Sequence, residues 1–173
     1  MYKQIRVLMA FLLVSLVAGC AGIGAPQNAE EFRKVARMAP SMLNKARTFN
    51  VSRSFNDVSA TLRKKSAECL NVAYEWHSSN GRHGVVTFKP TFIADRSHAE
   101  LDVQRKSEGG VKEIVIGGVP EGGQYRIVLD ATPESSSITK INLYVFSSID
   151  DRLLANTVTD WVKGTNLGCP DFT

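Results

Sequence analysis

The chain has 173 residues, of which 43% are hydrophobic, and it carries 21 basic and 17 acidic side chains. This apolar content is normal for a globular protein with its own core, and it excludes wholesale disorder. Lys3 and Arg6 precede the first apolar stretch, and without them the balance is 19 basic against 17 acidic residues. Because this charge is so even and no nucleic-acid-binding motif is present, we expect no nucleic-acid partner.

The first 20 residues have the organisation of a targeting segment. Lys3 and Arg6 supply a positive start, an apolar run over 7–17 is broken only by Ser15, and two small residues then precede Cys20. The apolar run is too short for a permanent membrane helix, which needs about 20 residues. The pattern therefore predicts a secretory signal peptide over residues 1–19.

The stretch Leu16-Val17-Ala18-Gly19-Cys20 resembles the lipobox of bacterial lipoproteins. The resemblance implies cleavage before Cys20, a diacylglycerol thioether on its sulfur and, in Gram-negative bacteria, an acyl chain on its amino group. Ala21, where an aspartate would signal retention, implies sorting to the outer membrane with the protein facing the periplasm. An anchor of two or three acyl chains would be stable. An ordinary signal peptide with a chance cysteine, or an uncleaved anchor, is the alternative.

Residues 20–47 are expected to form a lipidated tether and a short helix outside the globular domain. Residues 21–28 are small and turn-prone, whereas 29–43 show helical spacing, with Pro40 ending or kinking the helix. A helix that docks on the domain is one interpretation, and a helix that faces a partner or the membrane is the other. The candidate partner-facing residues are Phe32, Val35 and Leu43.

The globular domain, predicted over 48–173, begins with a short extended segment and a helix over about 55–70 that is capped by Ser54. From residue 71 the apolar period changes to two, which predicts about six short strands joined by turns. We expect these strands near 72–76, 86–92, 101–103, 111–116, 125–129 and 141–145. Pro90 indicates an edge strand or a bulge, and Glu100, Asp102 and Gln104 are expected to face water.

A second helix is predicted to begin near residue 149 and to end at Lys163-Gly164. The whole pattern predicts an α+β fold, in which an antiparallel meander buries one face under both helices. This element order is similar to that of helix-grip domains, including those of a lipoprotein subunit of the outer-membrane β-barrel assembly machinery. The likeness rests on element order alone, without a shared motif.

Helix-grip folds can hold a lipid or small apolar ligand between the sheet and the long helix. Four aromatic residues expected to point inward are candidates for facing such a ligand, although a sheet face more often uses aromatic residues as core. These candidates are Tyr74, Trp76, Phe88 and Tyr125.

Residues that would indicate catalysis are sparse. The sequence has no nucleophile elbow and no zinc-protease or paired-cysteine motif, and His77, His83 and His98 are interpreted as solvent-facing rather than metal-binding. We therefore expect no catalytic residues, no cofactor and no metal site. Once Cys20 is assigned to lipid, Cys69 and Cys169 remain as a predicted disulfide in an oxidising compartment.

Two functions remain open. The preferred one is a non-catalytic protein that is anchored in the outer membrane and docks to other envelope proteins. The alternative is a module of helix-grip type that binds a lipid or a small apolar ligand.

Overall fold

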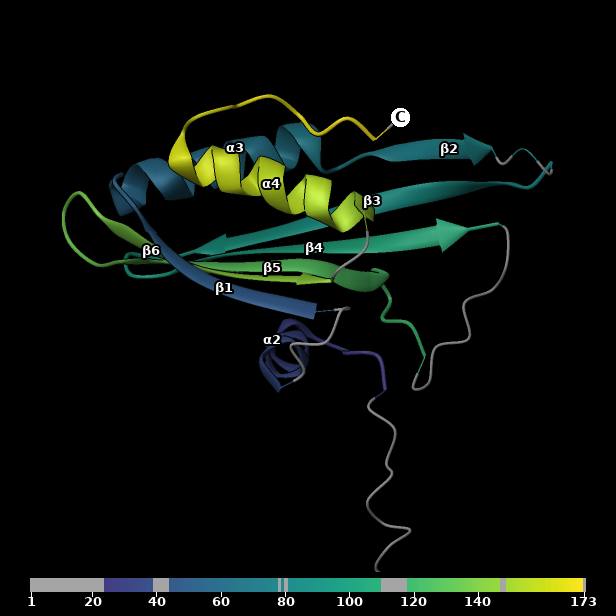
Figure 1. Ribbon diagram of the computed structural model, residues 1–173, viewed down its shortest axis with the longest axis horizontal. Coiled ribbons are helices and arrows are strands. Elements are labelled where there is room, and N and C mark those ends of the chain that lie inside the picture. The colour runs from purple at the N-terminus through teal and green to yellow at the C-terminus, as the bar shows by residue number, and fades with distance from the viewer. Residues whose placement is uncertain are drawn as a thin grey trace, which may run out of the picture.

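The computed structural model describes residues 24–38, 44–77, 79, 81–109, 118–146 and 149–172 (Figure 1). Six strands form one antiparallel sheet in the order β1-β6-β5-β4-β3-β2. The strands are β1 (Asn44–Val51), β2 (Ala73–His77), β3 (His83–Ala94), β4 (Ala99–Glu108), β5 (Gln124–Pro133) and β6 (Thr139–Phe146). The helices in the described part are α2 (Ala29–Met38), α3 (Phe55–Cys69) and α4 (Ile149–Lys163). The predicted α+β class and the antiparallel sheet are confirmed.

The set of strands differs from the expected one at β1, and one further expected strand is not tested. The expected short extended segment is part of β1, which pairs along its whole length with β6, from Asn44 with Phe146 to Val51 with Thr139. It is a sheet edge with mostly exposed side chains, so it lacks the apolar alternation that identifies a strand. The strand predicted over 111–116 lies outside the described residues.

Helices α3 and α4 pack on one face of the sheet, as predicted (Figure 1). Helix α3 begins after Ser54, whose hydroxyl oxygen accepts a hydrogen bond from the Asp57 backbone N–H at 3.2 Å. Helix α4 ends before Gly164, whose φ of 72° suits a residue without a side chain. Between the helices and the sheet lies the main core, which includes Val58, Leu62, Leu101, Ile127, Leu143 and Trp161.

Helix α2 covers the other face of the sheet, so the molecule has three layers (Figure 1). Phe32 and Ala36 of α2 are each only 2% exposed and form a second core with Val128 and Tyr144. The interpretation of Phe32 as partner-facing is therefore wrong, because its side chain is buried against the sheet. Val35 is half-buried, and Leu43 lies outside the described residues.

The position of α2 bears on the predicted domain boundary. Strand β1 begins at Asn44, four positions before the expected start of the globular domain at residue 48. The helix that was expected to belong to the tether contributes buried side chains to the same sheet. In the described residues, no helix has both the length and the apolar character needed to cross a membrane.

The chain after α4 returns across the face that carries α3 and α4. Cys169 is bonded to Cys69 at the end of α3, with their Cα atoms 5.1 Å apart, so the predicted pairing is present in the structure. Further along, the ring of Phe172 stacks on that of Phe88 with centroids 4.6 Å apart, and on that of Tyr74 at 5.8 Å. The segment is thus held by a covalent bond and by aromatic contacts.

Removing the disulfide should destabilise the fold strongly. The bridge joins residues 100 positions apart, and constraining a loop of this length in the unfolded chain stabilises the fold by about 4–5 kcal/mol. We expect the Cys69→Ser, Cys169→Ser double variant to lose about that much free energy of unfolding in urea titrations. Mass spectrometry after alkylation of the denatured, unreduced wild-type protein should show neither cysteine modified. Modification of both, or a double variant as stable as the wild type, would contradict the pairing.

Candidate functional site

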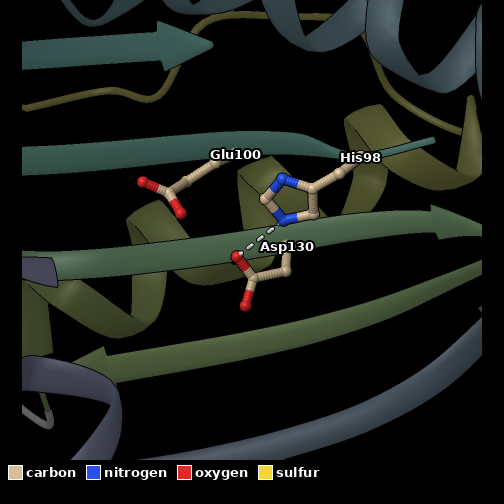
Figure 2. A group of neighbouring side chains, drawn as sticks. All are labelled: His98, Glu100 and Asp130. Atoms are coloured by element: carbon tan, nitrogen blue, oxygen red, sulfur yellow. Dashed lines mark hydrogen bonds and ion pairs between the residues drawn. The ribbon is translucent and has the colours of Figure 1, made fainter. Parts of the chain in front are cut away.

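Three carboxylates and a histidine gather on the sheet face that α2 covers. Glu100 and Asp102 alternate along β4 and therefore point to the same face, and Glu100 lies opposite Asp130 of β5. His98 directly precedes β4, and its Nε2 atom is 3.4 Å from Oδ1 of Asp130. Figure 2 shows the side chains of His98, Glu100 and Asp130 converging over the two strands. With Arg33, these residues are called the Arg33 cluster below.

Arg33 of α2 supplies the positive charge of the cluster. Its guanidinium donates two hydrogen bonds to Asp130, from Nε at 3.1 Å and from Nη2 at 2.7 Å, and it also forms an ion pair with Glu100. Burial lowers the pKa of Arg33. The hydrogen bonds and negative charges of Asp130 and Glu100 together raise this pKa by more than burial lowers it, so the net shift is upward. Arg33 therefore stays charged and joins α2 to two neighbouring strands.

Asp102 is the least compensated member of the cluster. Its side chain is buried, with the residue 9% exposed, and its Oδ1 atom has no hydrogen-bond partner among the described residues. Burial raises the pKa of Asp102 to about 7, the charge of Glu100 adds to the rise, and the charge of Arg33 opposes it. The net charge beneath α2 therefore changes near neutral pH.

Aromatic residues border the cluster. The rings of Phe32 and Tyr125 lie 6.1 Å apart between centroids, and Nε of Arg37 donates to the hydroxyl of Tyr144 at 3.2 Å. Burial raises the pKa of Tyr125, and the charges of Asp102 and Glu100 act in the same direction. The acidic groups thus lie beside apolar rings, which strengthens their interaction with Arg33.

Tyr125 is on the opposite face from the one predicted. It was expected to point inward together with Ile127, but Val103 pairs with Ile127 whereas Gln104 pairs with Tyr125. Arg126 is thus the extra residue of a β-bulge, which reverses the alternation of side chains. The interpretation of Tyr125 as a ligand-facing residue beneath α3 must be corrected.

The other three aromatic candidates do lie on the face of α3 and α4. Phe88 is 1% exposed, and Tyr74 and Trp76 are half-buried against the same core. Since the ring of Phe172 stacks on Phe88 and Tyr74, a side chain of this protein fills the space beside them.

The histidines differ in their surroundings. His77 and His83 are both exposed and lie opposite each other in the first hairpin, with ring centroids 6.3 Å apart. His98, in contrast, lies beside two carboxylates. One of its ring nitrogens and one carboxylate oxygen each of Glu100 and Asp130 lie within 4.8 Å of one another. Such a group has the residue types of a divalent-cation site. The two carboxylates already bind the guanidinium of Arg33, so in this arrangement the cluster is an ion-pair network.

Sequence reasoning placed Glu100 and Asp102 in water and did not single out Arg33 or Asp130. The expectation for the first two was wrong because α2 had been assigned to the tether, which left this sheet face without a cover. The sequence did contain an indication that these acidic residues are covered, because Asp102 and Asp130 each stand between apolar neighbours. Acidic residues are rarely buried unless they are paired, so a basic partner could have been sought on α2.

Comparisons with known proteins do not identify this chain. No family model matches it. No curated protein matches it either. Among solved structures, it is similar to a conserved protein from Geobacillus kaustophilus, with 15% identity, a TM-score of 0.35 and coverage of 70% of this chain and 93% of that one. A hypothetical protein from Helicobacter pylori has 13% identity and a TM-score of 0.34, with coverage of 76% and 86% respectively.

Replacing Asp102 with asparagine should change how stability depends on pH. Because the pKa of Asp102 is about 7 in the folded protein and 3.8 otherwise, its protonation favours folding at low pH. This contribution is lost as pH rises through 7, which amounts to about 2–3 kcal/mol between pH 5 and pH 8. Asp102→Asn should lack that loss and be more stable than the wild type at pH 8 in urea titrations.

The exposed Glu134→Gln variant is the matched control, because it also removes one carboxylate. It should follow the wild type at both pH values. Parallel losses of stability in the wild type and Asp102→Asn would contradict the role given to Asp102.

Removing the charge of Arg33 should loosen α2. Arg33→Met leaves Asp130 and Glu100 buried without their cation, and breaking a buried pair in this way costs about 3–5 kcal/mol. We expect a loss of this size in urea unfolding at pH 7.5, and faster hydrogen exchange in α2. Lys34→Met is the control, since Lys34 is the exposed neighbour on the same helix. Equal stability of the two variants would argue against the cluster as the attachment of α2.

Proposed function

We propose that this protein is a non-catalytic lipoprotein of the outer membrane that faces the periplasm and docks to other envelope proteins. Its anchor would be the acylated Cys20, and no cofactor would be needed. The proposal of lipidation is supported by the lipobox-like stretch and by the pairing of Cys69 with Cys169, which leaves Cys20 as the remaining cysteine of the three. A disulfide is also typical of an oxidising compartment such as the periplasm.

The attachment of α2 fits an anchored protein. Only residues 21–28 separate Cys20 from α2, and Arg33 joins this helix to β4 and β5. A lipid on Cys20 would therefore hold the sheet close to the membrane, with the α2 layer nearer to the anchor. The layer formed by α3 and α4 would face away from the anchor and toward other proteins.

The observation that carries the docking proposal is an uncovered strand edge in the sheet, beside the layer formed by α3 and α4. Strand β2 pairs with β3 only as far as Thr87, whereas β3 continues to Ala94. The backbone groups of an unpaired edge can bind another chain. The helix-grip likeness is kept as a proposal about the fold, but Phe172 occupies the neighbourhood of the aromatic residues that a bound lipid would need.

Cys20→Ala should abolish lipid attachment. We expect wild-type protein to incorporate labelled palmitate and to fractionate with outer membranes, and the variant to do neither. Ala21→Asp is the matched control, because it keeps the cysteine and should keep the label while moving the protein to the inner membrane. Wild-type protein without label, or released as soluble protein, would refute the anchored function.

A further inference from the structure

We propose that the uncovered edge of β3 binds an extended, acidic segment of a partner protein as an added strand alongside α3. The inference rests on the docking function proposed above and names the chemistry of the partner. The site, called the β3 groove below, consists of residues 88–94 of β3 and the flank of α3 that faces them.

The first observation is the direction of the backbone groups. The N–H of Phe88 donates to the carbonyl oxygen of Val72 at 2.9 Å, on the side away from β4. Since backbone groups alternate along a strand, those of residues 90, 92 and 94 point to the same open side. β4 covers the other side of this segment, and no described strand covers the open one.

Pro90 fits this edge position. It has no N–H to leave unsatisfied, which is why proline occurs on edge strands. The sequence-based expectation that Pro90 marks an edge or a bulge is confirmed as an edge. Phe92 and Ala94 still offer an N–H and a carbonyl each, so an added strand would find several backbone groups to pair with.

The second observation is a hollow beside this edge. An open groove of about 680 Å³ runs between β3 and α3. Its lining includes Arg63, Ser66 and Ala67 of α3 and Lys89, Phe92 and Ile93 of β3. Ile93 is 56% exposed, so its apolar side chain is open to a bound segment. Its lining extends along β3 from Lys89 to Ala94, a span that accommodates about five to seven residues of an added strand at about 3.4 Å each.

The third observation is the charge of the groove. Its charged lining residues are Arg63 and Lys89, and no carboxylate is among the residues that line it. Within the described part of the chain, neither cation forms an ion pair, and the guanidinium of Arg63 lies 5.3 Å from the centre of the Phe92 ring. A segment with acidic side chains would neutralise both charges at an apolar surface.

The surface next to the β3 groove also carries basic side chains. A second groove continues past Arg63 and Lys64, and the carboxylate near it belongs to Asp95. That carboxylate accepts hydrogen bonds from the backbone N–H groups of Ser97 and His98, which lower the pKa of Asp95. Asp95 is therefore engaged in its own turn.

Charge also argues against a second copy of this chain as the occupant. Two β3 edges paired with each other would bring together two grooves whose charged lining residues, Arg63 and Lys89, are all cationic. Like charges placed together oppose association. An acidic strand from another protein meets no such repulsion.

Peptide binding to the full-length protein in detergent micelles tests this inference. The probe is a fluorescent acetyl-Glu-Val-Glu-Val-Glu-Val-amide, and its counterpart has lysine in place of each glutamate. Fluorescence anisotropy should show at least tenfold tighter binding of the acidic peptide. The double variant Arg63→Glu, Lys89→Glu should reverse this preference, whereas Lys45→Glu, Arg47→Glu on the opposite sheet edge should leave it unchanged.

Hydrogen exchange locates the bound peptide. The amides of Phe92 and Ala94 should exchange at least tenfold more slowly in the presence of the acidic peptide. The inference is overturned if both peptides bind equally, if the charge reversal has no effect, or if these amides are unprotected. It is also overturned if sedimentation shows the protein paired with itself through this edge. These outcomes do not depend on Cys20, so failure of lipidation and failure of the groove are distinguishable.

Discussion

The buried contact between Arg33 and Asp130 is the interaction on which the arrangement of this molecule depends. It fixes α2 on a sheet face that would otherwise expose Val128 and Tyr144. A buried ion pair is seldom more stabilising than well-packed apolar residues would be, because both charges lose their hydration. We expect its main effect to be on specificity, since the orientation of α2 that pairs Arg33 with Asp130 and Glu100 is the one that buries Phe32.

The sequence predicted the layer formed by α3, α4 and most of the sheet because these elements, apart from β1, have a regular apolar period. Ser54 and Gly164 further identified helix ends by local chemistry that does not depend on the rest of the fold. The period of a helix indicates which of its faces is apolar, but not what covers that face. For this reason α2 was recognised as a helix and yet placed outside the domain.

The candidate site was harder to predict, for two physical reasons. A row of acidic residues at every second position has the same pattern whether water or a basic helix lies above it, so Glu100 and Asp102 were ambiguous. A bulge adds one residue without changing the composition of its strand, so the reversal of Tyr125 left no trace in the pattern. The edge position of Pro90 followed from a local rule and needed no such information.

The bulge at Arg126 also limits how the chain can change in length. Arg126 donates to both carboxylate oxygens of Asp151 on α4, each at 2.7 Å, and its guanidinium lies over the ring of Phe146. Deleting Arg126 would remove the extra residue of the bulge. It would also remove the guanidinium that binds the buried carboxylate of Asp151. The turn over 134–138, at the other end of β5, is exposed and lacks such contacts with the core. Related sequences should therefore vary in length at that turn and keep a constant length around Arg126.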